Sequence, residues 1–494
     1  MEHSLSLANL ISIPGAVARP RYDRGRLQAG ILHIGVGNFH RAHQAVYLDD
    51  LFNAGKDHDW AIVGAGVRQN DAAMRRALER QDWLTTVVEL EPGANRARIS
   101  GSMIDFVPVG ENGQAIVDRL DDPAIRIVSL TVTEGGYCID PATGAFNPDH
   151  PEIRYDAAHL DIPRGVFGVL LAALKRRRDR ALAPFTIMSC DNIPHNGRVT
   201  MEAIAGLADL IDPALAAFVR ETVAFPNSMV DRITPATTDR ERAILEERFG
   251  IADNWPVFCE PFRQWVLEDQ FPNGRPALEE VGVNFTPHVA AFELMKLRIL
   301  NGGHAAIAYP AALLGVHFVH EAMADPLVRG FLDKLETEEI IPHVPPVPGV
   351  DLADYYRLIA NRFANPDVGD TIPRLAQDGS NRQPKFILPS TRDRLAAGAE
   401  VVGLALESAL WCRYCAATTD GGNVFALNDP NAERLMPAAL AAKDSPAAFL
   451  ALRNIFGDLT DAPRFRSSFE TALNSLWREG TRATLQCYLS GTLT

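Results

Sequence analysis

The pattern of the chain changes near residue 285, and this change constrains the fold more than any other feature. Before it, short apolar runs of β-forming residues alternate with helical stretches, a pattern typical of α/β domains. After Ala290, strand signals nearly vanish and helical patterns follow one another to the end. The sequence therefore predicts an α/β domain over residues 1–288 and a mainly α-helical domain over residues 289–494.

Composition excludes several classes of function. The formal charge of −14 argues against a nucleic acid or an anionic membrane surface as partner. No apolar run is long enough to span a bilayer, and we see no signal peptide. The basic run 175–178 is interpreted as the solvated C-terminal turn of a helix over 167–178.

Six irregularly placed cysteines indicate a reducing compartment, so we expect a cytoplasmic protein. Cys412 and Cys415 form a lone C-x-x-C without a second pair. We expect these two thiols to pack in a helical core rather than to bind zinc, and we expect no metal site.

The first predicted strand leads into a glycine turn. Residues 29–35 form a β-like run, followed by Gly35-Val-Gly37 and a helix start. Such glycines permit a tight turn and a close approach of the backbone to a pyrophosphate, as in Rossmann-like dinucleotide-binding domains. The third glycine of the usual fingerprint is replaced by His40. An ordinary strand–helix turn has the same appearance.

The second predicted strand supports the nucleotide interpretation. Residues 60–68 form this strand, and Asp71 lies just past it, where an acid binds a ribose 2′-hydroxyl. The neutral Asn70 and the cationic Arg68 beside it would not repel a 2′-phosphate. The pattern therefore favours NAD as cofactor and leaves NADP open.

Three further polar stretches lie in the α/β half. The strands predicted at 84–90, 125–133 and 185–190 are apolar, and the last two end in clustered polar residues, where open α/β sheets bind ligands. Residues 225–235 form a polar stretch of the same kind, for which a plain loop is the alternative interpretation, and late strands are predicted at 256–260 and 264–268. The candidate site residues in these stretches are Thr133, Glu134, Asn192, Asp231 and Arg232.

Just past the domain boundary, residues 293–304 concentrate chemically useful side chains. Glu293, Lys296, Asn301 and His304 are spaced by 3, 5 and 3 residues among apolar neighbours. In a regular α-helix of about 100° per residue, the four would fall within a sector of about 140°. A solvated helix face is the alternative, but the apolar neighbours favour an active site because buried Lys and His need partners.

The helical half also supplies cations. Arg374, Arg382 and Lys385 lie close together in sequence and could hold a polyhydroxylated or anionic substrate by charge-assisted hydrogen bonds. A solvated basic loop is the alternative interpretation.

Taken together, these motifs resemble the mannitol dehydrogenase family of metal-independent polyol dehydrogenases and hexuronate reductases. The resemblance runs from about residue 30 to at least residue 390, and within the family it is strongest to members that interconvert D-mannitol and D-fructose with NAD. The motifs that carry it are I-G-V-G-x-F-H-R-A-H-Q at 34–44, T-E-G-G-Y-C-I-D at 133–140, S-C-D-N-I-P-H-N-G at 189–197, N-x-M-V-D-R-I-T-P at 227–235, E-x-M-K-x-x-x-L-N-G-x-H at 293–304 and P-K-F at 384–386.

The resemblance implies catalytic roles. Lys296 matches the family's general base for alcohol oxidation. Asn192 and Asn301 match two asparagines that hold the reacting oxygen. His304 matches a histidine that hydrogen-bonds the substrate, and Glu293 a glutamate that helps the proton leave.

It also implies binding roles. The resemblance implies that the substrate is bound by Asp231, Arg374, Lys385 and Arg382. Arg382 stands where a relative has lysine. Asn70 stands where a glutamate is expected in an NAD-specific enzyme. The cofactor positions are Gly35, Gly37, Phe39, Arg41 and Asp71, to which we add Thr133, Glu134 and Arg232.

The implied chemistry needs no metal. A lysine acts as base when burial lowers its pKa towards neutrality, and amide donors can stabilise the developing alkoxide. We therefore expect an NAD-dependent enzyme for D-mannitol and D-fructose. The family resemblance also implies a monomer. The alternatives are a hexuronate reductase, an arabinitol or sorbitol dehydrogenase, and a nucleotide sensor that would have lost part of the catalytic set.

Overall fold

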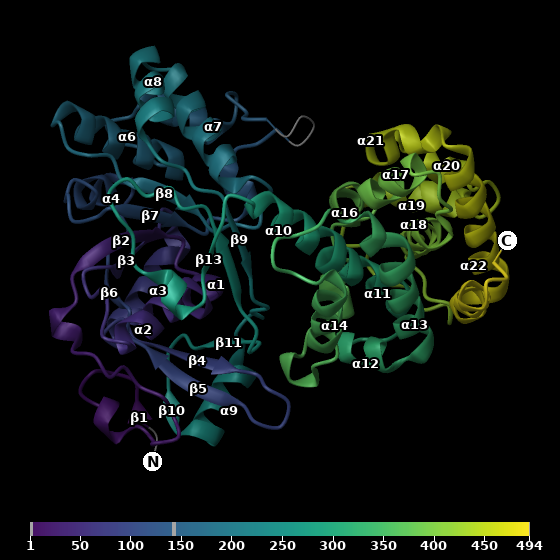
Figure 1. Cartoon of the computed structure of the whole chain (residues 1–494), viewed down its shortest axis with the longest axis horizontal. Helices are drawn as coiled ribbons and strands as arrows, with labels where there is room; N and C mark the ends of the chain where they lie inside the picture. Colours follow the sequence, from purple (N-terminus) through teal and green to yellow (C-terminus); the bar gives the residue numbers. More distant parts are fainter. Residues whose placement is uncertain (1–2, 141–144, 494) are drawn as a thin grey trace. The chain divides into compact units, whose positions relative to one another are not determined.

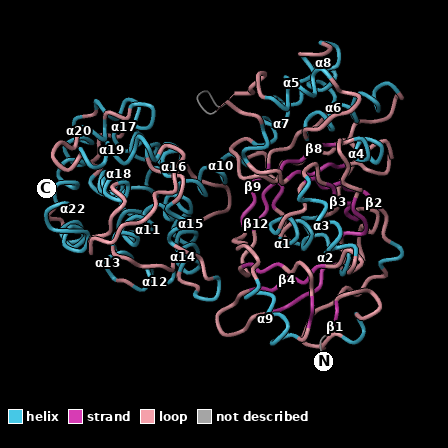
Figure 2. The backbone as a smooth tube through the Cα atoms, turned by 180° about the vertical axis from the view of Figure 1, so that it is seen from behind, coloured by secondary structure: helices cyan, strands magenta, loops and turns pink. Residues whose placement is uncertain are grey.

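A computed structural model describes residues 3–140 and 145–493. The chain divides into two compact units, which we call unit 1 (Met1–Ala290) and unit 2 (Ala291–Thr494) (Figure 1). All the strands drawn in Figure 2 belong to unit 1. In the described part of the chain, no helix is both long and apolar enough to cross a membrane.

The centre of unit 1 is a five-stranded sheet in which every neighbouring pair is parallel. Its spatial order, β6-β3-β2-β7-β8, is the 3-2-1-4-5 order of a Rossmann-like domain, which confirms the predicted fold class. The strands predicted around 29–35, 60–68, 125–133 and 185–190 are all present. The bounds are β2 Ala29–Ile34, β3 Ala61–Ala65, β6 Met103–Phe106, β7 Ile127–Leu130 and β8 Thr186–Ser189.

Helices cover both faces of this sheet. Successive residues of a strand point to opposite faces, so Ile31 and Leu32 of β2 belong to two different apolar clusters, the second shared with Leu170 of α6. Burial on both faces explains why these strands read as continuous apolar runs. The helices of unit 1 are α1 Asn38–Ala42, α2 Gln44–Asn53, α3 Gln69–Glu79, α4 Gln114–Arg119, α5 Pro151–Ala158, α6 Val166–Asp179, α7 Asn196–Asp209, α8 Pro213–Thr222 and α9 Asp239–Phe249.

Two three-stranded sheets complete unit 1, and one corrects the sequence interpretation. The alternative of a plain loop over residues 225–235 is wrong, because this stretch contains strand β9, which pairs antiparallel with β12. The four-residue strand is flanked by polar residues and prolines, which concealed it. The bounds are β4 Thr85–Glu89, β5 Arg96–Ser100 and β11 Val257–Cys259 in one sheet, and β9 Ser228–Asp231, β12 Gln264–Leu267 and β13 Asn284–Phe285 in the other; β1 His3–Ser4 pairs with β10 Ile251–Ala252.

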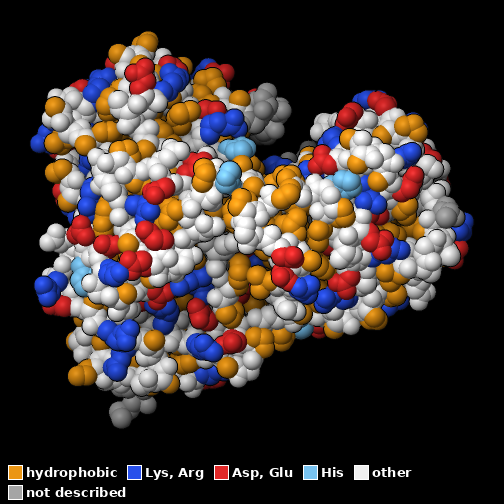
Figure 3. Space-filling model, in the orientation of Figure 1, with side chains coloured by type: hydrophobic (Ala, Val, Ile, Leu, Met, Phe, Trp, Pro, Cys, Tyr) orange, Lys and Arg blue, Asp and Glu red, His pale blue; other side chains and the backbone are white. Residues whose placement is uncertain are grey.

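The basic run at the end of α6 is only partly solvated. Arg177 is buried, against the prediction of a wholly solvated turn, and burial lowers the pKa of its guanidinium to about 10. Four backbone carbonyls accept its hydrogen bonds, those of Leu120 (2.7 Å), Asp122 (2.6 Å), Ile125 (2.8 Å) and Ala183 (2.9 Å). On the face drawn in Figure 3, acidic and basic side chains are interspersed.

Unit 2 is helical, and α18 is its most deeply buried helix. Cys412 and Cys415 lie in α18 as buried free thiols, as predicted from their spacing. The helices are α10 Val289–Met295 at the boundary, α11 Gly302–Leu313, α12 Val319–Ala324, α13 Pro326–Lys334, α14 Leu352–Phe363, α15 Ile372–Ala376, α16 Gly379–Phe386, α17 Leu388–Ala396, α18 Val402–Cys415, α19 Ala432–Ala441, α20 Ala447–Leu450, α21 Arg453–Phe456 and α22 Pro463–Ser490.

Two features of unit 2 differ from what the sequence suggested. The alternative of a basic loop around residues 374–386 is wrong, because α15 and α16 occupy this stretch. Two π-helical segments, η5 Lys296–Asn301 and η6 Leu335–Ile340, interrupt the α-helical runs that contain them. The first lies within the run of candidate catalytic residues.

Candidate functional site

Unit 1 contains a cavity of about 510 Å³ at the carboxyl ends of β2, β3 and β7. This is the edge of an open α/β sheet at which ligands bind. Four of the predicted cofactor residues line it, namely Gly35, Gly37, Asp71 and Thr133. Arg68, Asn70, Glu152 and Arg164 also contribute to the wall.

Gly35 is required by the backbone itself. Its φ is +96°, and a Cβ there would lie 2.2 Å from the carbonyl oxygen of Thr131. The Thr131 hydroxyl donates to the Gly35 carbonyl at 2.6 Å, which holds the turn against the end of β7. At Gly37 a Cβ would have its nearest neighbour 3.8 Å away. Only a ligand in the cavity would therefore demand glycine at position 37.

Buried histidines lie beneath this turn. His40 occupies the place of the third fingerprint glycine, and its ring stacks on that of His33 with centroids 3.4 Å apart. His33 contacts the hydroxyls of Ser129 (2.7 Å) and Thr131 (2.9 Å) through its two ring nitrogens. The close helix–strand packing that glycine usually provides is here replaced by a pair of stacked rings.

The carboxylate of Asp191 organises the neighbouring loop. It accepts hydrogen bonds from the backbone N–H groups of Val132 and Thr133, both at 2.9 Å, and from the Tyr137 hydroxyl at 2.7 Å. Thr133 thereby keeps a left-handed conformation with φ of +68°. Sequence reasoning missed this role because an Asp-Asn pair after a strand also fits ordinary turn chemistry.

Asp71 lies just past the second strand, as predicted. It is in the first turn of α3, and its carboxylate accepts the N–H of Arg68 at 2.9 Å. A Cβ on Gly66 would approach that carboxylate to 2.3 Å, so glycine there leaves room for the acid. Asp71 lines the cavity together with Arg68 and Asn70.

Other predicted cofactor residues have structural contacts. Arg41 is buried and donates to the carbonyl of Trp255 and to Asn38. Arg232 is buried and donates to the carbonyls of Glu260 (3.0 Å) and Ala42 (2.5 Å) and to the Glu89 carboxylate (2.5 Å). A role in cofactor binding stays a prediction for both.

Two predicted cofactor residues remain. Phe39 stacks on His43 with centroids 4.8 Å apart. The side chain of Glu134 lies outside the part of the chain that the structure describes.

In unit 2, a π turn arranges the candidate catalytic residues. The expectation of a regular α-helix over 293–304 is wrong, because residues Lys296–Asn301 are π-helical. A π-helix hydrogen-bonds residue i to i+5, so Lys296 and Asn301, five apart, lie one turn apart on the same side. Lys296 and Glu293 are each only 8% exposed. Single π turns inside α-helices are frequent at functional sites.

His304 follows at the start of α11, beside several cations. Its ring stacks on Phe363 with centroids 4.2 Å apart. Burial holds its pKa well below the usual value, and positive charges act in the same direction. In decreasing order these charges are those of Arg374, Arg362, Arg382 and Lys296.

The predicted cations Arg374 and Arg382 are thus brought near His304 and Lys296. Arg362 of α14 was missed, since in the sequence it is one basic residue on an amphipathic helix. Lys385 of α16 is exposed. Asn192 is exposed after β8 and Asp231 is buried at the end of β9; both belong to unit 1.

Two buried polar atoms of this group have unused hydrogen-bonding capacity. Within the described chain, neither the side-chain oxygen of Asn301 nor Nε2 of His304 has a partner. Buried polar atoms are normally satisfied, so a ligand hydroxyl would complete both.

Family models match both parts of the chain. The Mannitol dehydrogenase Rossmann domain matches residues 29–280, and the Mannitol dehydrogenase C-terminal domain matches residues 288–477. A Rossmann domain followed by a helical C-terminal domain is the architecture of this class of two-domain dehydrogenases.

Whole-length relatives make the assignment specific. The chain is 59% identical over 475 residues to the mannitol 2-dehydrogenase of Cereibacter sphaeroides, covering 96% of this chain and 99% of the relative. It is 41% identical over 496 residues to that of Aspergillus fumigatus, covering 99% of each.

Solved structures agree. A ternary complex of Pseudomonas fluorescens mannitol 2-dehydrogenase with NAD and D-mannitol matches with a TM-score of 0.89 and 42% identity, covering 99% of each chain. A D-sorbitol dehydrogenase in substrate-free form matches with a TM-score of 0.90 and 32% identity, covering 97% of this chain and 100% of that one. The chain belongs to the mannitol dehydrogenase family, which confirms the predicted family and enzyme class.

The contrast between the two glycines gives a first prediction. Gly35→Ala should lower stability by about 1–3 kcal/mol, because a non-glycine residue is forced into a left-handed conformation, and should weaken NADH binding. Gly37→Ala should leave the Tm within about 1–2 °C of the native value, because the added methyl makes only an ordinary contact with the Gly35 carbonyl, yet should still weaken binding. Thermal unfolding and NADH fluorescence titration measure the two effects; unchanged NADH affinity in Gly37→Ala would contradict the placement of the cofactor.

Buried histidines give a second prediction. Burial lowers the pKa of His33 and of His43 to about 3, and that of His40 well below its usual value. The unfolded chain binds these protons near pH 6.5, so the stability that they contribute is complete above 6.5 and is lost as the pH falls towards 3. Each should contribute a slope of about 1.4 kcal/mol per pH unit below pH 6.

The measurement is urea unfolding at pH 6.0 and 5.0. His43→Leu should reduce the slope of unfolding free energy against pH by about 1.4 kcal/mol per unit, since one titrating group is removed. An equal slope in the variant would mean that His43 does not stay neutral in the folded protein.

Proposed function

We propose that this chain is an NAD-dependent polyol dehydrogenase that interconverts D-mannitol and D-fructose, with Lys296 as general base. The observation that carries the proposal is the buried Lys296 placed one π turn from Asn301, with His304 beside them. The relatives named above support the substrate and the cofactor.

In the oxidation direction, NAD+ would supply the acceptor for the hydride that leaves C2 of the polyol. The amine of Lys296 takes the proton of the C2 hydroxyl, and burial favours the neutral amine that this requires. The side-chain amide of Asn301 donates to the oxygen as negative charge develops on it, and the family resemblance implies the same role for Asn192. Glu293, buried on the preceding turn, receives the proton from the lysine and passes it on.

His304 would act as a neutral hydrogen-bonding group. Its lowered pKa keeps the imidazole uncharged at neutral pH, so Nε2 can pair with a substrate hydroxyl without adding charge next to the lysine. Asp231, Arg374, Arg382 and Lys385 would hold the remaining hydroxyls.

A hexuronate reductase is the second candidate. The cations that act on His304, above all Arg374 and Arg362, are the groups that a substrate carboxylate would need. Sorbitol and arabinitol remain further candidates among polyols, and the structural relative named a D-sorbitol dehydrogenase supports the first.

NAD would occupy the cavity of unit 1, with the glycine turn at the pyrophosphate and Asp71 at the ribose. Asn70 and Arg68 beside Asp71 would allow some use of NADP, because neither side chain repels a 2′-phosphate. We further propose a cytoplasmic monomer; all six cysteines are free thiols, which suits a reducing compartment.

The third prediction concerns the base. Lys296→Ala should lower kcat by about 10²–10⁴-fold, the usual contribution of a general base, with NADH affinity unchanged. Lys443→Ala, an exposed lysine of unit 2, is the matched control and should retain full activity. A variant that loses NADH affinity but keeps its turnover at saturation would refute the assignment.

The fourth prediction tests the substrate and the metal-free mechanism. With excess chelator at neutral pH, the protein should oxidise NADH rapidly with D-fructose and slowly or not at all with D-fructuronate. Turnover of fructuronate alone would make it a hexuronate reductase, and activity lost on chelation and restored by a metal would overturn the lysine mechanism. Tight NADH binding without turnover of either would favour a sensor.

A further inference from the structure

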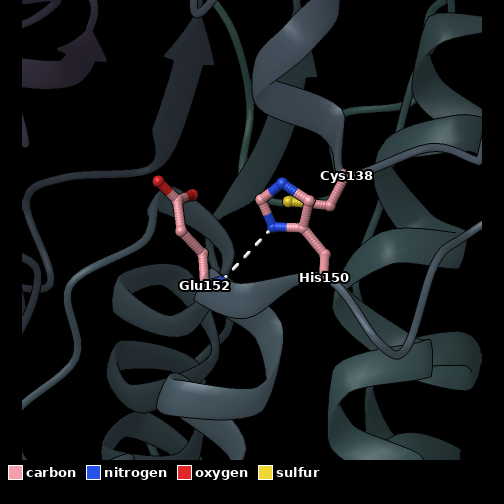
Figure 4. A group of neighbouring side chains, drawn as sticks. All are labelled: Cys138, His150 and Glu152. Carbon is pink, nitrogen blue, oxygen red and sulfur yellow. Dashed lines mark hydrogen bonds between the residues drawn. The ribbon is translucent and has the colours of Figure 1, made fainter.

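Three potential metal ligands meet in unit 1, outside the candidate catalytic set. The sulfur of Cys138, a ring nitrogen of His150 and a carboxylate oxygen of Glu152 all lie within 4.8 Å of one another (Figure 4). Cys138 follows a 3₁₀ turn at residues Glu134–Tyr137, His150 caps the N-terminus of α5, and Glu152 is in its first turn. Sequence reasoning, which looked for repeated Cys spacings, did not identify this group.

We propose that Cys138, His150 and Glu152 form a zinc site in the wall of the nucleotide cavity, at which zinc opposes cofactor binding. Thiolate, imidazole and carboxylate are the ligand types that zinc prefers, and three protein ligands leave a fourth position for water. Tetrahedral zinc with bonds of roughly 2.0–2.3 Å needs its ligands about 3.3–3.8 Å apart. Closing the group from 4.8 Å therefore needs movements of about 1 Å, which the exposed Glu152 side chain can supply.

The local charge suits a cation. Burial, together with the carboxylates of Glu152 and Asp156, raises the pKa of the Cys138 thiol to about 12. The same carboxylates that disfavour a thiolate attract a divalent ion. When zinc binds, the S–H proton leaves to solvent and a zinc–thiolate bond forms, with no change of oxidation state.

The imidazole is available for this role at low cost. Its Nδ1 accepts the Glu152 N–H at 3.3 Å, which is long for an N–H donor. His150 is partly exposed and Glu152 exposed, so the ion can enter from solvent. The buried Cys138 closes the inner side.

Because the proposed zinc site shares Glu152 with the nucleotide cavity, zinc binding would affect cofactor binding. Glu152 lines this cavity together with Gly136 and Arg164. Drawing this carboxylate onto a metal changes the wall that the cofactor meets, and linkage requires that the cofactor then weakens zinc binding by the same factor. The proposal concerns binding alone, so it can be tested apart from the proposed catalytic role of Lys296.

The test is titration of the chelator-treated full chain with Zn²⁺ by calorimetry, and with Co²⁺ followed by the thiolate-to-cobalt absorption band. The native protein should bind one equivalent of metal and show the band. Cys138→Ser should lose the band, and Cys138→Ser and His150→Ala should each raise the Kd for zinc by about tenfold or more. Saturating zinc should raise the Kd for NADH at least about threefold in the native protein but not in His150→Ala.

Cys487→Ser is the matched control, because Cys487 is a partly buried thiol in unit 2; it should behave as the native protein does. Should Cys138→Ser fail to fold, His150→Ala and Glu152→Gln alter more accessible groups and serve in its place. Native zinc affinity in these variants, or no saturable binding to the native chain, would overturn the site. An unchanged Kd for NADH in saturating zinc would overturn its effect on the cofactor.

Discussion

The carboxylate of Asp191 is the interaction on which the ligand edge of unit 1 depends. It ties the end of β8 to the loop after β7 through two backbone N–H groups and the Tyr137 hydroxyl. A buried acid satisfied in this way costs little and fixes three groups at once. It holds Thr133 on the cavity wall, while the next residue, Asn192, is exposed. One residue of the Asp-Asn pair thus builds the edge, and its exposed neighbour Asn192 is the one for which we propose a role in the reaction.

The sheet was predictable because its strands are buried on both faces and therefore read as apolar runs bounded by glycine. Strand β9 was not, since four residues among polar neighbours carry little periodic signal. The π turn at Lys296–Asn301 was beyond a pattern argument as well, because apolar spacing reports the average helical period and not a single inserted residue. The π turn supports an active site at residues 293–304, as the spacing suggested. The reason differs, because Lys296 and Asn301 are brought together by a π turn and not by a regular α-helix.

The burial of three arginines could not be predicted from the sequence. Arg177, Arg41 and Arg232 each looked like a surface charge or a phosphate ligand, yet all three are buried and donate to backbone carbonyls. Most of the carbonyls that accept these hydrogen bonds are distant in sequence, so only the fold brings them together. A glycine, in contrast, could be identified from the chain alone at Gly35, where the backbone conformation admits little else.

The cations around His304 bear on the choice between a neutral and an anionic substrate. Arg374 is paired with the carboxylate of Asp370, and Arg382 donates to the carbonyl of Leu375 at 2.7 Å. The carboxylate of a uronate would have to compete with these partners for the guanidinium groups. The hydroxyls of a polyol can instead accept hydrogen bonds from the guanidinium N–H donors that remain unused. The existing partners of these arginines therefore support the proposed polyol substrate over a uronate.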